Sequence, residues 1–257
     1  MVNMNESESI EDKHLIYEGL DLLKSLYAIN SLSTHEQEMA RFIIEQMKGI
    51  DVEVWQDEMG NVFATKGHAE AYPCVAAHID EVHAPCKRNI VVADDMVYAH
   101  DDEGNRVGIG ADDKNGIWIA LNLLHTEPIL KAAFFVHEEK FEGNAGCVGS
   151  GACDLSFFNN VKYVLECDRK GGSDLVYIAK DVPLCEPDFV AAEIMSQYGY
   201  APVVGGKTDV AKLKVRGLGK PCCNISCGYY NPHKDNEYTM LGELYNCLAF
   251  VKSIIRF

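Results

Sequence analysis

The segment GIGADDKNGIWIAL (residues 108–121) places two adjacent carboxylates between a glycine-rich turn and an apolar run. The apolar residues recur at helical spacing and predict a helix from about Lys114 to His125. Because like charges repel, Asp112 and Asp113 are unfavourable neighbours unless a cation lies between one of them and another ligand. The other ligands of such a cation should then follow other elements of the same fold.

Three further apolar runs end in acidic or histidine side chains, as buried strands do at the rim of a sheet. They are YPCVAAHID (72–80), LKAAFFVHEE (130–139) and VKYVLECD (161–168). Strand-like and helix-like patterns alternate along the chain, which is typical of an open α/β sheet with helices on both faces. We therefore predict a single α/β domain over residues 1–257, with a mixed, mostly parallel central sheet flanked by helices and with residues 1–10 flexible.

The remaining elements are predicted from periodicity and from turn residues. Short strands are expected at 52–55, 61–67 and 220–227 and, broken by turns, within 89–110; helices are expected at 11–28, 34–49, 186–199, 208–219 and 237–257.

The composition limits the partners of the chain. It has 39 acidic and 23 basic residues, and its net charge is −16 at pH 7. Nucleic acids and anionic membranes bind basic faces, so neither is expected as a partner. The N-terminus lacks the pattern of a signal peptide, and no apolar run approaches the roughly 18 residues that span a bilayer. The ten cysteines have no repeating spacing, so we expect free thiols and a cytoplasmic location.

Two imidazoles and three carboxylates end or follow the predicted sheet strands, namely His78, Asp112, Glu139, Asp168 and His233. Zinc and similar divalent ions bind imidazole nitrogen and carboxylate oxygen readily. Five ligands are too many for one catalytic zinc, which usually has three protein ligands and an open position. If Asp112 bridges, the five ligands provide three for each of two metals, and two cations offset its charge.

The neighbours of these ligands suit supporting roles. His78 and Asp80 are two residues apart on an extended segment, so Asp80 can accept the second N–H of the imidazole and orient it. Glu138 and Glu139 are adjacent and diverge, so one can bind metal while the other acts as a general base.

The order of these motifs resembles that of the co-catalytic di-zinc exopeptidases. GADDKNG (110–116) and the tail GGKTDVAKLKVRGLGKPCCNISCGYYNPHKDNEY (205–238) look most like peptidase T, in which the tail begins Gly-Gly-Thr/Ser-Asp. The resemblance spans roughly residue 31 to the C-terminus, and the ordered set of motifs is more specific than any one of them.

The resemblance implies a role for each matching residue. His78, Asp112 and Asp168 would hold one metal, and Asp112, Glu139 and His233 would hold the other, with a cis peptide bond after Asp112. Glu138 would be the general base and later the acid, and Asp80 would orient His78. Asp113 and Lys114 also match the motif, but we expect a structural role at the turn for them rather than a catalytic one.

The chain departs from the resemblance in its size. Peptidase T usually carries a second, inserted domain between its last two ligands, whereas only 65 positions separate Asp168 from His233 here. This chain resembles the catalytic domain alone, so an oxyanion donor from an inserted domain has no counterpart. Tyr229 and Tyr230 are the candidates for that task.

We therefore expect a di-metal exopeptidase that hydrolyses short peptides with a metal-bridged water activated by Glu138. Two divalent ions are expected as cofactors, with zinc preferred over cobalt or manganese. An aminopeptidase is the preferred activity, because a site rich in carboxylates suits a free α-amine. A carboxypeptidase or N-acyl amino acid amidohydrolase stays open, since Arg169 and Lys207 could bind a substrate carboxylate. A non-catalytic metal-binding or assembly protein is the alternative of another class, and the oligomeric state is not predicted.

Other cysteines and histidines receive structural interpretations. Cys222, Cys223 and Cys227 lie near His233 but lack a C-x-x-C pair, so core thiols are favoured over a zinc site. Histidines without a partner in the pattern, such as His83, are expected at the surface or in packing.

Overall fold

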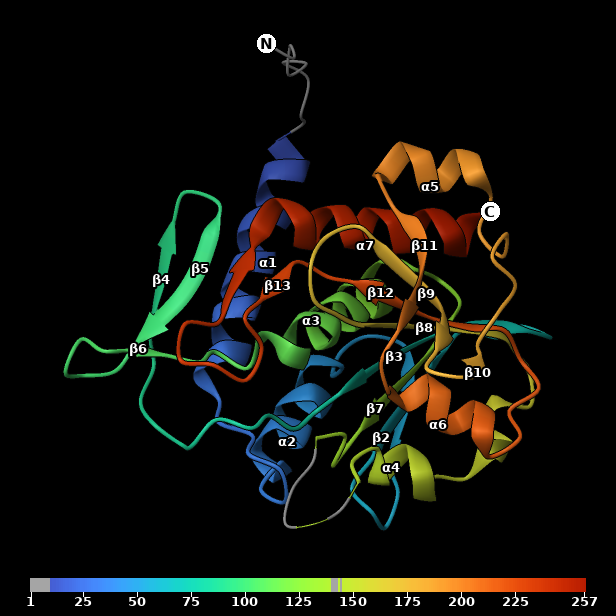
Figure 1. Ribbon diagram of the computed structural model, residues 1–257, viewed down its shortest axis with the longest axis horizontal. Coiled ribbons are helices and arrows are strands. Elements are labelled where there is room, and N and C mark those ends of the chain that lie inside the picture. The colour runs from blue at the N-terminus through green and yellow to red at the C-terminus, as the bar shows by residue number, and fades with distance from the viewer. Residues whose placement is uncertain (1–9, 140–142, 144) are drawn as a thin grey trace.

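A mixed sheet forms the centre of the computed structural model, which describes residues 10–139, 143 and 145–257 (Figure 1). Of the residues predicted to be flexible, 1–9 lie outside the described ones, and Ile10 begins the first helix. The strand order in this large sheet is β1 (Val52–Gln56), β2 (Val62–Lys66), β7 (Leu130–Phe135), β3 (Tyr72–His78), β8 (Val161–Arg169), β12 (Cys222–Ser226), β9 (Asp174–Ala179) and β10 (Val182–Pro183), and β11 (Ala201–Gly205) also pairs with β9.

The four central strands β7, β3, β8 and β12 run parallel to one another. The two strands expected at 52–55 and 61–67 form the antiparallel β1–β2 hairpin, which pairs antiparallel with β7. At the other edge β9 pairs antiparallel with β12 and β10 and parallel with β11. The prediction of a mixed sheet with a parallel centre is therefore confirmed. The sequence analysis did not predict β9 and β11, although β9 contains the short apolar run LVYIA (175–179) and β11 is the mostly exposed segment APVVG.

Helices cover both faces of the large sheet, as predicted (Figure 1). The larger apolar core lies on the face covered by α3, the smaller one on the face covered by α4 and α6. The helices are α1 (Ile10–Ala28), α2 (Gln37–Gln46), α3 (Ala111–Thr126), α4 (Val148–Ala152), α5 (Ala192–Tyr198), α6 (Asp209–Val215) and α7 (Leu241–Arg256), with a 3₁₀ helix η1 (Leu155–Phe158).

Burial explains why these segments occupy the centre. Every residue of β3 and β7 is buried, which matches the continuous apolar runs of strands covered on both faces. The helix α3 packs against β3, β7 and β8, and its Trp118 is 1% exposed. None of the helices within the described residues combines the length and the apolar character needed to cross a membrane.

A second, smaller sheet lies beside the first and was not predicted as a unit. Its order is β13 (Tyr229–Tyr230), β14 (Tyr238–Met240), β5 (Met96–His100) and β4 (Asn89–Ala93), and β6 (Arg106–Val107) pairs with β5. Figure 1 shows the β4–β5 hairpin projecting from the main body. The pairing of β14 with β5 joins segments about 140 residues apart, which local patterns do not reveal.

Candidate metal centre

The five side chains predicted as ligands meet at one edge of the large sheet, beyond the carboxyl ends of its central strands. His78 ends β3, Glu139 follows β7 and Asp168 lies near the end of β8. Asp112 lies at the start of α3, and His233 lies in the turn between β13 and β14. Open α/β sheets bind ligands at this edge, so the topology itself gathers the five residues.

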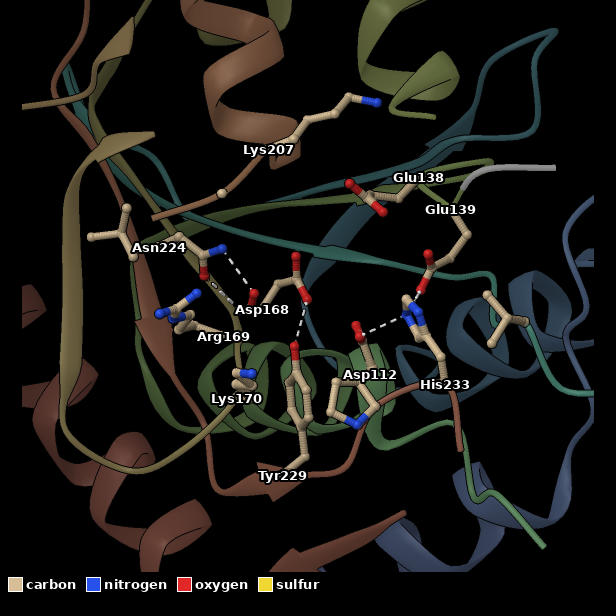
Figure 2. Close-up of a pocket in the computed structure, with 14 residues that line it drawn as sticks. Asp112, Glu138, Glu139, Asp168, Arg169, Lys170, Lys207, Asn224, Tyr229 and His233 are labelled. Atoms are coloured by element: carbon tan, nitrogen blue, oxygen red, sulfur yellow. Dashed lines mark hydrogen bonds and ion pairs between the residues drawn. The ribbon is translucent and has the colours of Figure 1, made fainter. Parts of the chain in front are cut away.

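The five residues form two triads that share Asp112. The nitrogen His78 Nε2 lies 3.1 Å from Asp112 Oδ1 and 3.6 Å from Asp168 Oδ1. The nitrogen His233 Nε2 lies 3.2 Å from Asp112 Oδ2 and 2.6 Å from Glu139 Oε1 (Figure 2). Each oxygen of Asp112 therefore faces a different imidazole, which is the arrangement that a bridging carboxylate requires.

The backbone around Asp112 is irregular. Asp112 (φ −82°, ψ 97°) and Asp113 (φ −120°, ψ 40°) are not helical, so regular helix begins at Lys114, as predicted. The peptide bond between the two aspartates is cis, as the resemblance implies. The preceding Gly110 has φ +63°, and a Cβ there would collide with the buried carboxylate of Glu81. This turn therefore requires glycine directly before the segment that carries Asp112.

A buried carboxylate that the sequence reading did not single out holds this turn. Glu237 accepts hydrogen bonds from the main-chain nitrogens of Ile109 (3.0 Å), Gly110 (2.7 Å) and Asp112 (3.2 Å). The nitrogen His83 Nε2 lies 3.0 Å from the same carboxylate, so His83 packs against it. Glu237 lies only four residues after the predicted ligand His233, and this closeness is the signal in the sequence that could have suggested that Glu237 contacts the turn before Asp112.

Asp80 supports the site through both its main chain and its side chain. The nitrogen His78 Nδ1 lies 2.9 Å from the carbonyl oxygen of Asp80 and 3.5 Å from its carboxylate, so the carbonyl is the nearer acceptor. The carboxylate accepts hydrogen bonds from the main-chain nitrogens of Glu138 (2.9 Å) and Glu139 (3.1 Å) and from Ser33 Oγ (2.5 Å). Asp80 thus fixes the end of β3 relative to the segment that follows β7.

The side chain of Glu138 lies beside the triads. Its Oε1 accepts a hydrogen bond from Cys147 Sγ at 3.0 Å. Burial raises the pKa of Glu138, and the nearby charge of Glu139 raises it further. Glu138 also forms a potential ligand group with His78 and Glu139, so the geometry brings it within reach of a cation beside His78.

The electrostatics of the two triads favour a cation. Burial raises the pKa of Asp168, and the charge of Asp112 adds to this effect. Hydrogen bonds to Asp112 and then to Glu139 raise the pKa of His233 to about 10. The buried carboxylates of the two triads repel one another, and a pair of divalent ions between them would offset this repulsion. The mixed nitrogen and oxygen donor set fits zinc.

Tyr229, Tyr230 and Asp113, which the sequence analysis named as oxyanion-donor candidates or as structural, all form hydrogen bonds near the triads or at the turn. Tyr229 is buried, lines the cavity and donates a hydrogen bond to Asp168 Oδ1 (3.3 Å), whereas Tyr230 donates to the carboxylate of Glu243. Asp113 accepts hydrogen bonds from the main-chain nitrogens of His78 and Gly116, which is the structural role expected of it.

Lys114 and the cysteines near His233 are buried and take part in the packing of the fold. The ammonium of Lys114 donates to the carbonyl oxygen of Ile29 and lies 3.2 Å from Glu81 Oε2. Cys222, Cys223 and Cys227 are buried free thiols, and none of the potential ligand groups found among the described residues contains a cysteine.

A cavity of about 500 Å³ opens over the two triads (Figure 2). Its lining combines the acidic and histidine side chains with three basic residues, Arg169, Lys170 and Lys207. The ammonium of Lys207 donates to the carbonyl oxygen of Ala145, and its side chain extends away from the triads (Figure 2). Cavities of this size hold small ligands of a few residues rather than folded chains.

Comparison with solved structures identifies the fold. The aminopeptidase PepT from Bacillus cereus superposes with a TM-score of 0.75 and 16% identity, over 95% of this chain and 97% of that chain. This chain has the fold of peptidase T. A tripeptidase from Staphylococcus aureus (TM-score 0.74, 14% identity, 93% and 97% covered) and an aminopeptidase from Desulfurococcus kamchatkensis (0.71, 17%, 94% and 95%) share it.

Sequence comparison adds a shorter match. No protein-family model matches the chain. A curated protein of Pyrobaculum aerophilum, described as a LysW-lysine/LysW-ornithine hydrolase, is 37% identical over 65 residues. The match covers 25% of this chain and 19% of that protein, so it spans about a fifth of the relative's length.

Proposed function

We propose that this protein is a di-metal exopeptidase that hydrolyses short peptides, with aminopeptidase activity as the preferred reading. The observation that carries the proposal is the pair of triads that share Asp112. Proteins with this fold include an aminopeptidase and a tripeptidase, and the short sequence match is to a hydrolase, which support the same class of reaction.

The ligands proposed for one ion are His78, Asp112 and Asp168, and Asp112, Glu139 and His233 are proposed for the other. Two divalent ions held by these residues would polarise a substrate carbonyl and lower the pKa of a water. Glu138 would take the proton of that water and later give it to the amine of the leaving group. Its raised pKa suits a carboxyl group that must hold a proton between these steps.

Two features of the cavity bear on which end of the peptide is cleaved. The carboxylates around the triads suit a free α-amine, which favours an aminopeptidase. Arg169 and Lys207 also line the cavity, and a substrate carboxylate could bind there. A carboxypeptidase or an N-acyl amino acid amidohydrolase is therefore the second candidate.

Metal analysis combined with a peptide panel tests the proposal. We expect about two divalent ions per chain after dialysis against zinc, as a bridged pair requires. We expect hydrolysis of peptides with a free N-terminus and its loss on chelation. Cleavage of N-acetylated peptides instead would favour the second candidate. A chain that binds no zinc, cobalt or manganese would overturn the proposal.

Replacement of the proposed base separates an enzyme from a metal-binding protein without turnover. Glu138→Gln should retain its metal and lose about 10²–10⁴-fold in kcat, the usual contribution of general-base catalysis. The control Glu53→Gln changes an exposed carboxylate on β1 and should leave kcat unchanged. Equal rates for Glu138→Gln and the wild type would remove Glu138 from this role.

A further inference from the structure

The side chain of Cys147 contacts the proposed base from the segment that leads into α4. Its Sγ donates a hydrogen bond to Glu138 Oε1, and the two atoms lie 3.0 Å apart. Figure 2 shows Glu138 beside Glu139 in the cavity, and both side chains belong to the potential ligand group with His78. The thiol therefore binds one oxygen of the carboxylate proposed as the general base.

The main chain fixes the position of Cys147. Residues 147–149 form three main-chain hydrogen bonds with the segment that ends β7 and follows it. These bonds join the nitrogens of Cys147, Val148 and Gly149 to the carbonyl oxygens of Glu138 (2.7 Å), His137 (2.9 Å) and Val136 (3.0 Å). Because the main chain and the thiol of Cys147 both bind Glu138, the thiol keeps a set place relative to the carboxylate.

The backbone conformation at Cys147 is unfavourable for a residue with a side chain. Cys147 has φ +52° and ψ 42°, the left-handed region that glycine adopts readily and other residues adopt at a cost. The preceding Gly146 has φ +74°, and a Cβ there would collide with the carbonyl oxygen of Glu138. Residues held in such conformations gather at functional sites, so a cysteine here points to a task for its thiol.

The surroundings of the thiol keep it protonated. Cys147 is 0% exposed. Burial raises the pKa of the Cys147 thiol, and the charges of Asp209 and Glu138 raise it further. A neutral thiol has an S–H group to donate, whereas a thiolate would repel the carboxylate. Since the thiolate is the reactive form of cysteine, Cys147 is suited to donate a hydrogen bond rather than to act as a nucleophile.

We propose that Cys147 is a positioning residue for the base, and that its thiol holds Glu138 Oε1 so that Oε2 takes the proton of the attacking water. The proposal rests on the proposed function and adds a residue to it. A glutamate side chain has several staggered rotamers, and a donor that fixes one oxygen orients the other before the reaction. Cys147 lies outside the two segments that carry the resemblance, residues 110–116 and 205–238.

Three replacements of Cys147 test the proposal, with kcat and KM for trialanine measured on the zinc-loaded protein. Cys147→Ala and Cys147→Gly remove the donor and should lower kcat about 2- to 10-fold, the usual range for one hydrogen bond, with KM unchanged. Cys147→Gly also suits the left-handed backbone, so it should fold even if Cys147→Ala does not. Cys147→Ser supplies a hydroxyl donor and should restore kcat to within about twofold of the wild type.

The control Cys74→Ala removes another buried thiol, which lies on β3 and donates to the carbonyl oxygen of Val75. It should keep kcat, and its free energy of unfolding measures the general cost of losing a buried thiol. Elemental analysis should give the same metal content for all variants. Equal kcat for Cys147→Ala and Cys74→Ala, a loss of metal from the Cys147 variants, or a fall in kcat that Cys147→Ser does not restore would each overturn the proposal.

The failure of the positioning role and the failure of the proposed function give different results. Hydrolysis that the Cys147 variants leave unchanged removes only the positioning role. Absence of hydrolysis in the wild type contradicts the proposed function, and the infrared S–H stretching band of Cys147, assigned by its loss in Cys147→Ala, then tests the contact alone. The band should move to higher frequency in Glu138→Ala, which removes the acceptor, and stay in place in the control Glu53→Ala. A band that does not move in Glu138→Ala would overturn the hydrogen bond on which the proposal depends.

Discussion

Replacement of Glu237 by glutamine tests whether the turn before Asp112 sets the metal affinity. The carboxylate is fully buried and accepts hydrogen bonds from three main-chain nitrogens, two through Oε2 and one through Oε1. An amide of the same shape has one acceptor oxygen. If that oxygen faces Ile109 and Gly110, the amide NH₂ faces the N–H of Asp112, and two donors then meet.

The magnitude follows from this one lost contact. A buried donor left without an acceptor costs about 1–3 kcal/mol, and loss of a group that supports a metal ligand typically weakens metal affinity by about 10- to 100-fold. We therefore expect Glu237→Gln to lower the free energy of unfolding of the metal-free chain by about 1–3 kcal/mol. Its affinity for zinc should fall by about one to two orders of magnitude.

Two measurements check these values. Competition with a chromogenic chelator gives the zinc affinity, and urea unfolding in the presence of EDTA gives the stability. The control Glu243→Gln alters a carboxylate that accepts hydrogen bonds from the hydroxyl of Tyr230, without any contact to the turn before Asp112. A zinc affinity of Glu237→Gln equal to that of the control would refute the reasoning, whatever the change in stability.

Two further predictions concern metal content and alkaline pH. Asp112→Asn should lose both ions and Asp168→Asn only one, so elemental analysis after dialysis should give about zero and about one ion per chain. Burial raises the pKa of Cys153 to about 11 and that of Cys222 to about 12. Both thiols then ionise in the unfolded chain first, so the free energy of unfolding should fall as pH rises above 9, by about 1.4 kcal/mol per thiol at pH 10. Urea unfolding at pH 7, 9 and 10 measures the fall, and a flat profile would contradict it.

The parts of the site that could be read from the sequence are those fixed by local patterns. His78, Glu139 and Asp168 each follow a short apolar run, and the parallel centre of the sheet then brings the strand ends together. Asp112 could be recognised as a candidate ligand from its own sequence context, because two adjacent carboxylates repel each other unless a positive charge lies nearby.

The residues that position the ligands do so through contacts between segments far apart in the sequence, and the periodicity of the sequence does not predict such contacts. Glu237 holds a turn about 127 residues earlier in the chain, and Ser33 bonds to Asp80 across 47 positions. The small sheet likewise forms only when β14 meets β5. The hydrogen bond from His78 to the carbonyl of Asp80, rather than to its carboxylate, depends on a side-chain torsion that spacing alone leaves open.

These distant contacts give the two triads different degrees of organisation. The side chains of His78 and Asp168 are 1% and 9% exposed and stand on strands of the large sheet. The side chain of His233 is 48% exposed and belongs to a turn of the small sheet. A buried ligand has already lost its rotamer freedom on folding, whereas an exposed one loses it when the ion binds. The triad with Asp168 is therefore the preorganised half of the centre. The triad with His233 draws its order from the small sheet and from Glu237, which joins that sheet to the turn of the shared Asp112.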